Sequence, residues 1–130
     1  MKPFLNALLL ADKVYIDKAT NKSVIAGTFG RVWFQTFPGV HVGSFVYINL
    51  SDFQGKHQLA MRFVQLSDGR ELAKSSSIDI KQAERLGHHE IAMQLPALSF
   101  PHPGKYAIEI LWDGEFLGQV KLDVVQLRRD

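Results

Sequence analysis

The chain has 130 residues, of which 46% are hydrophobic and 22% are charged, and its formal net charge is +2. This length suits one domain, residues 1–130, which can bury a hydrophobic core without metal or disulfide cross-links. The absence of cysteine excludes disulfides, thiol catalysis and thiolate metal sites. Basic residues are scattered among acidic ones, so we expect no nucleic-acid partner.

The N-terminal segment is apolar but too short to span a membrane. Residues 4–11 are mostly hydrophobic, and Asp12 and Lys13 follow them, whereas a membrane-spanning helix needs about eighteen apolar residues. The two charges also end the run too early for a secretory signal peptide. We therefore expect a buried first strand, no membrane association and a cytoplasmic location.

The rest of the chain consists of short runs of β-branched, aromatic and alternating apolar residues, separated by turn residues, a pattern typical of β-strands. Gly27 and Gly30 interrupt the second run and predict a bend, so that this strand could contribute to two sheets. Residues 35–42 are predicted to form a loop, and residues 81–86 a single helical turn that Gly87 ends. The eight predicted strands cover about residues 5–16, 23–34, 43–50, 59–64, 71–80, 88–95, 106–112 and 115–124.

Two Asp-Gly pairs predict tight hairpin turns, because these residues readily adopt the positive φ angles that such turns need. One pair is Asp68–Gly69 and the other is Asp113–Gly114. Short strands with turns at near-regular spacing predict an all-β fold, a single immunoglobulin-like antiparallel β-sandwich of about eight strands. The predicted core consists of Leu9, Ile25, Val46, Ile48, Met61, Phe63, Ile91, Met93, Ile108, Ile110, Val120, Leu122 and Val124.

The segment from Gly104 to Ile108 resembles the tyrosine-corner region of immunoglobulin and fibronectin type III domains. In that motif a tyrosine hydroxyl bonds back to the backbone and fixes the crossover between the sheets. The resemblance implies structural roles for Gly104 and Tyr106. Ile108 stands where antibody domains carry a cysteine, so the inter-sheet disulfide is absent.

Nearly the whole chain also resembles a family of small uncharacterised bacterial β-sandwich proteins, a domain of unknown function. The matching segments are residues 7–15, 25–32, 37–41 and 103–106. This resemblance implies a β-sandwich fold and assigns no biochemical activity.

The cluster most similar to a metal site is His88-His89-Glu90. His88 and Glu90 would share one face of a strand, but a catalytic zinc site needs a third ligand. We expect solvent-facing polar residues here, and no metal, cofactor or catalytic residue elsewhere. A small metal-dependent or carbohydrate-directed enzyme that uses His88 and Glu90 stays open as the alternative.

Trp33, Phe37 and His41 form the candidate binding patch. Large apolar side chains occupy both faces of the second predicted strand, which is either buried on both sides or exposed for binding or self-association. We expect a non-enzymatic binding or assembly module with an unidentified protein partner. A homodimer would cover the weakly charged edges at residues 75–78 or 8–10. A carbohydrate-binding module in which Trp33 or Trp112 stacks on a sugar is a further alternative.

Overall fold

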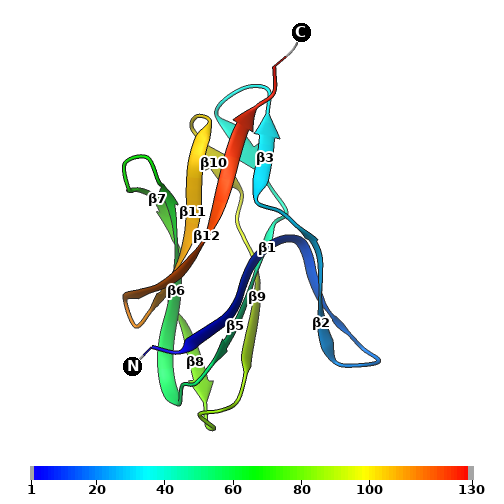
Figure 1. Cartoon of the computed structure of the whole chain (residues 1–130), viewed down its shortest axis with the longest axis vertical. Helices are drawn as coiled ribbons and strands as arrows, with labels where there is room; N and C mark the ends of the chain where they lie inside the picture. Colours follow the sequence, from blue (N-terminus) through cyan, green and yellow to red (C-terminus); the bar gives the residue numbers. More distant parts are fainter. Residues whose placement is uncertain (1, 129–130) are drawn as a thin grey trace.

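The computed structural model describes residues 2–128, and these fold into β-strands joined by turns and loops (Figure 1). None of these residues lies in a helix that is long and apolar enough to cross a membrane. The twelve strands of the described segment are β1 (Phe4–Asp17), β2 (Lys22–Thr28), β3 (Arg31–Phe34), β4 (Gly39–His41), β5 (Phe45–Ser51), β6 (Gly55–Gln65), β7 (Arg70–Lys74), β8 (Ile78–Gln82), β9 (His89–Gln94), β10 (Leu98–Phe100), β11 (Gly104–Trp112) and β12 (Glu115–Gln126).

The strands form two main sheets, which confirms the predicted immunoglobulin-like sandwich. The first sheet has the order β2-β1-β5-β9, and the second has the order β3-β12-β11-β6-β7, with β8 also paired to β6. Strands β1, β5 and β9 take the places of strands A, B and E of an immunoglobulin domain, and β12, β11, β6 and β7 those of G, F, C and C′. No strand of the described residues takes the place of strand D, so β9 is an edge strand.

The strand count exceeds the predicted eight because two predicted strands are each divided in two and because two further strands, β4 and β10, form. The predicted strand over residues 23–34 is divided into β2, which pairs with β1, and β3, which pairs in parallel with β12. This confirms that the bend at Gly27 and Gly30 lets one segment serve both sheets. The predicted strand over 71–80 is likewise divided into β7 and β8, which pair with different halves of β6. Strands β4 and β10 form a short ladder in segments predicted to be irregular.

The helical turn predicted for residues 81–86 is wrong. Strand β8 continues to Gln82, and the segment after it consists of bends and turns. The buried Gln82 side chain donates hydrogen bonds to the carbonyl oxygens of Phe53 and Gly87. This tertiary contact holds the segment against the β5–β6 loop in place of a helix.

Of the two predicted hairpin turns, only one is tight. Asp113 and Gly114 have φ angles of 50° and 83° and connect Trp112 directly to Glu115 across a two-residue loop. The β6–β7 connection instead has four residues, 66–69, because Gln65 lies opposite Arg70. Gly69 has a positive φ angle of 72° in this wider loop.

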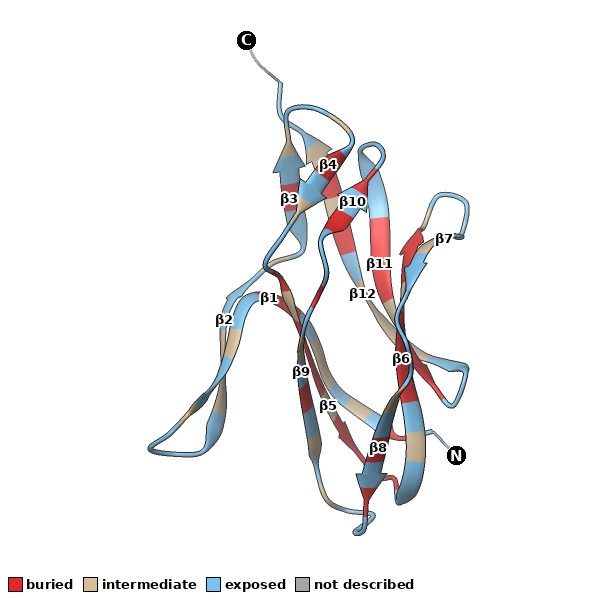
Figure 2. Cartoon of the chain, turned by 180° about the vertical axis from the view of Figure 1, so that it is seen from behind, coloured by how far each residue is buried: buried red, intermediate tan, exposed pale blue. Residues whose placement is uncertain are grey.

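The core lies between the two sheets (Figure 2), and most of the predicted core residues are buried there. Leu9 is a correction, since it is 36% exposed, and Leu10 is buried in its place. Leu10 lies opposite the inward-facing Val46, whereas Leu9 lies opposite Tyr47 on the outer face. Ile25 is half-buried because β2 and the second half of β1 form a hairpin that projects from the sandwich. Met93 and Val120 are half-buried against the core.

Candidate functional site

Two residues of the predicted aromatic patch, Trp33 and Phe37, lie on different sides of β3. Trp33 is 53% exposed on β3, and its neighbour Phe34 faces the opposite side of that strand, toward the core. Phe37 packs on Phe34, with ring centroids 5.9 Å apart. His41 packs on Phe29 at 5.3 Å. Phe37 therefore joins the core margin, while Trp33 retains the exposure that a binding role requires, and that role stays a prediction.

Trp112 is only 2% exposed, so its indole cannot stack on a sugar. It packs instead against the ring of Phe53 at 4.9 Å and that of His57 at 4.7 Å. Its indole Nε1 is buried and has no hydrogen-bond partner among the described residues. Trp112 belongs to the core at the end of the sandwich where the β11–β12 turn lies.

His88 and Glu90 are held by separate polar partners. His88 Nδ1 lies 3.2 Å from Asn49 Oδ1, while Glu90 accepts a short hydrogen bond from the Tyr47 hydroxyl. This bond, with help from Ser23, lowers the pKa of Glu90. Burial, followed by the same bond to Glu90, raises the pKa of Tyr47. In the described part of the chain, no group of three or more His, Cys, Asp or Glu residues is placed to hold a metal ion.

A His–Asp pair that sequence reasoning missed lies at the β11–β12 turn. His57 Nδ1 is 2.6 Å from Asp113 Oδ2, and His57 Nε2 is 2.9 Å from the carbonyl oxygen of Gln54. The other Asp113 oxygen accepts the backbone N–H of Gln58. An imidazolium satisfies both acceptors by donating from both nitrogens. Both ring nitrogens of His57 are therefore engaged by acceptors of the protein itself, and the pair connects the start of β6 to the β11–β12 turn.

The pair stabilises the fold over a limited pH range. The hydrogen bond to Asp113, followed by that to Gln54, raises the pKa of His57. The stabilisation from His57 is therefore complete below its unfolded pKa, about 6.5, and is lost as the pH rises through the folded pKa. The hydrogen bond from His57 lowers the pKa of Asp113, whose contribution is lost as the pH falls through its folded value.

We expect His57→Phe to remove this pH dependence. Phenylalanine retains a ring beside Trp112 but has no group that can bind Asp113 or Gln54. The loss in the free energy of unfolding should be about 1 kcal/mol near pH 5.5, a small value because solvent screens the pair and the side chain of Asp113 is 48% exposed. The loss should be smaller near pH 9, because the stabilisation from His57 disappears as the pH rises through its folded pKa. Urea unfolding of both proteins at the two pH values measures the effect. An equal loss at both would contradict the assigned titration.

The residues with predicted structural roles lie at the two ends of β11. Gly104 and Tyr106 lie near its start, and Asp113 and Gly114 follow its last residue. The Tyr106 hydroxyl donates a hydrogen bond of 2.6 Å to the carbonyl oxygen of His102, four residues upstream. This is the bond that defines a tyrosine corner. Gly104 begins β11 with a φ angle of 151°, which favours glycine. Asp113 and Gly114 form the tight β11–β12 turn.

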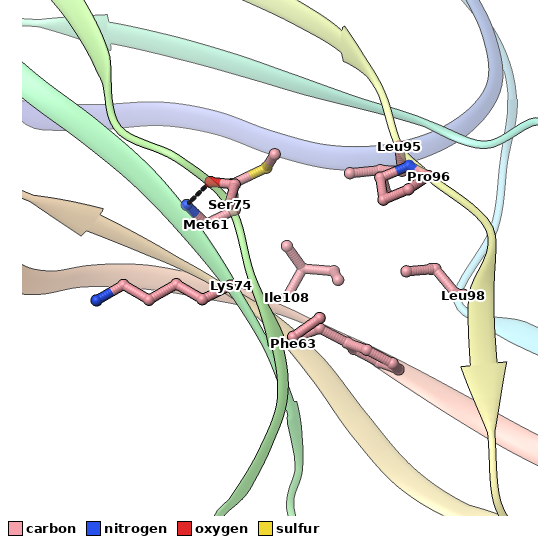
Figure 3. Close-up of a pocket in the computed structure, with 9 residues that line it drawn as sticks. Met61, Phe63, Lys74, Ser75, Leu95, Pro96, Leu98 and Ile108 are labelled. Atoms are coloured by element: carbon pink, nitrogen blue, oxygen red, sulfur yellow. Dashed lines mark hydrogen bonds between the residues drawn. The ribbon is translucent and has the colours of Figure 1, made fainter.

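An apolar cavity of about 100 Å³ opens on the side of the sandwich where strand D is missing (Figure 3). Leu95, Pro96 and Leu98 line one wall, and Ala73 and Ser75 line the other. Met61, Phe63 and Ile108 line it from the core, and the Lys74 side chain extends away from it. Ser75 Oγ accepts the backbone N–H of Met61 at 2.8 Å, which fixes the second wall. The volume suits one apolar side chain.

Comparison with known proteins places the chain in a family. Residues 6–125 match the family of unknown function DUF6941. The chain belongs to this family. This agrees with the resemblance that the sequence suggested to a domain of unknown function. No curated protein matches this DUF6941 member.

Two solved structures are similar to this DUF6941 member in outline. An immunoglobulin-like protein, PA1606 from Pseudomonas aeruginosa, aligns over 95% of this chain and 97% of its own length, with 11% identity and a TM-score of 0.42. The alkylpurine DNA glycosylase AlkC of Pseudomonas fluorescens, bound to DNA containing an abasic site analog, aligns with 13% identity and a TM-score of 0.45. That alignment covers 73% of this chain but only 27% of AlkC. Neither likeness supports an activity.

Proposed function

We propose that this protein is a non-enzymatic binding module that holds an apolar side chain of a protein partner in the cavity on its open side. The observation that carries the proposal is the cavity itself, which gives a partner access to the core residues Met61, Phe63 and Ile108. Binding at an apolar surface cavity is favourable when an apolar side chain of the partner displaces water from it.

The polar clusters support a structural role rather than a chemical one. His57 is engaged at both ring nitrogens, and Glu90 is engaged by Tyr47. A general base needs a free lone pair within reach of a substrate proton. The alternative enzyme that would use His88 and Glu90 is therefore less well supported than binding at the cavity.

Photo-crosslinking from the cavity tests the proposal. We expect p-benzoylphenylalanine placed at position 73, in place of Ala73, to form a covalent adduct with one discrete protein in cells of the source organism. The same group in place of Lys121, an exposed residue of β12 facing away from the core, is the matched control. Identical adducts from both positions, or none from position 73, would contradict the proposed function.

A further inference from the structure

The free edge of β9 leads directly to the cavity. Strand β9 pairs with β5 on one side, and no strand within residues 2–128 pairs with it on the other. It ends at Gln94, and the next two residues, Leu95 and Pro96, line the cavity wall. An extended segment lying along β9 would therefore reach the cavity at its end.

The register identifies which backbone groups of β9 point outward. Leu95 donates its N–H to the carbonyl oxygen of Ser44 at 2.9 Å, in continuation of the pairing of Gln94 with Phe45. In an antiparallel ladder the residues that bond to the partner strand alternate with those that do not. Ile91 and Met93 consequently bond to β5, while Glu90, Ala92 and Gln94 direct their N–H and C=O groups toward the free edge.

This edge carries fewer of the features that usually protect an exposed strand, and Glu90 is its one carboxylate. Natural edge strands carry lysine, proline or a bulge that hinders pairing. Strand β9 contains no lysine or proline, and its register with β5 has no shift. The neighbouring free edge, β7, differs because Arg70, Glu71 and Lys74 are three of its five residues. Of these two edges, β9 is the one open to strand addition.

The cavity lies beside the free edge of β9, between the two sheets. The cavity is bounded by the end of β7 and by the segment after β9, so both sheets reach this side. In Figure 2, β9 and β8 lie on the same side of the molecule. One added strand needs about 4.8 Å beside β9.

The charge on β9 indicates one feature of the bound segment. Glu90 is exposed on the outer face of β9, and its hydrogen bond from Tyr47 favours the carboxylate form. Opposite charges on directly opposed residues stabilise paired strands. A basic residue is therefore favoured opposite Glu90, whereas the inward-facing positions near Leu95 favour apolar residues.

We propose that the partner contributes an extended segment that adds to the first sheet as a β-strand along β9, with an apolar side chain in the cavity beside Leu95 and a basic side chain opposite Glu90. Backbone hydrogen bonds would supply affinity and the alternate side chains specificity, as in other cases of strand addition. This inference rests on the proposed function and adds the conformation and chemistry of the ligand.

Peptides selected on the intact protein test the inference. A phage-displayed library of random short peptides is the probe, and the selected peptides are then synthesised. We expect alternating apolar and basic residues. In nuclear magnetic resonance, the peptide should slow hydrogen exchange at the amides of Glu90, Ala92 and Gln94. The amides of Ile91 and Met93, which bond to β5, should be protected with or without peptide.

Two substitutions separate strand addition from cavity binding. Ala92→Pro removes an outward N–H without removing a bond to β5, and should raise the peptide Kd about tenfold, whereas Ala92→Val should leave it within about twofold. Ala73→Phe narrows the cavity and should also weaken binding. Peptides sensitive only to Ala73→Phe, with no new amide protection, would overturn strand addition and leave cavity binding intact. Peptides insensitive to both substitutions, or no selected peptides, would overturn both. If Ala92→Pro fails to fold, the exchange pattern of the unmodified protein decides.

Discussion

Tyr106→Ala should lower the free energy of unfolding by about 3–5 kcal/mol, the cost typical of removing a buried aromatic side chain. Tyr106 is 0% exposed. Its ring lies 5.0 Å from that of Phe100, edge to face, and 5.8 Å from that of Phe63. Alanine would leave a cavity between the sheets and remove the bond to His102. The midpoint and slope of a urea unfolding curve give the change.

Tyr106→Phe separates the hydrogen bond from the packing. Phenylalanine retains the ring but cannot donate to the carbonyl oxygen of His102, so we expect a loss of about 0.5–1.5 kcal/mol. Tyr15→Phe is the matched control, since Tyr15 is half exposed on the projecting hairpin and its variant should stay within about 0.5 kcal/mol. An unchanged midpoint for both Tyr106 variants would show that Tyr106 is not structural.

Gly39→Ala should lower the free energy of unfolding by about 1–3 kcal/mol through overpacking. A Cβ atom at position 39 would lie 2.4 Å from the ring of Phe34. That ring cannot easily move, because Phe37 and Phe100 pack against it at centroid distances of 5.9 Å and 5.8 Å. The substitution would therefore displace the β4–β10 ladder, and thermal unfolding would show a lower Tm.

Gly30→Ala is the control for this prediction. No atom lies within 4 Å of a Cβ atom placed at position 30, and we expect a change within about 0.5 kcal/mol. Equal losses at positions 30 and 39 would show that the cost arises from backbone conformation rather than from contact with Phe34.

The alternation of side chains was sufficient to predict the sandwich. Pairs such as Met61 and Phe63, or Ile108 and Ile110, lie two residues apart and are buried together, because a strand repeats every two residues. Although the Asp68–Gly69 pair lies in a four-residue loop, the Asp113–Gly114 turn formed as predicted, since both of its residues readily adopt positive φ angles. Such features depend on local chemistry and are readable from one sequence.

Register depends on contacts that the sequence does not contain. Leu8, Leu9 and Leu10 are chemically identical, and only pairing with β5 decides that Leu10 is buried while Leu9 lies outside. A register shift near Leu5 in the same pairing shows how easily such an assignment changes. Trp112 was equally ambiguous, because burial of an aromatic residue at a strand end depends on what folds over it.

The candidate sites were decided by tertiary structure. His57 and Asp113 are 56 residues apart in the chain, and they meet because β6 and β11 are neighbours in the second sheet. The cavity exists because the described chain places no strand beside β9. A missing neighbour leaves no mark on the residues of β9 themselves. The sequence determined by itself most of the segments that become strands, and the packing of the two sheets decided which strand edge and which cavity stayed open.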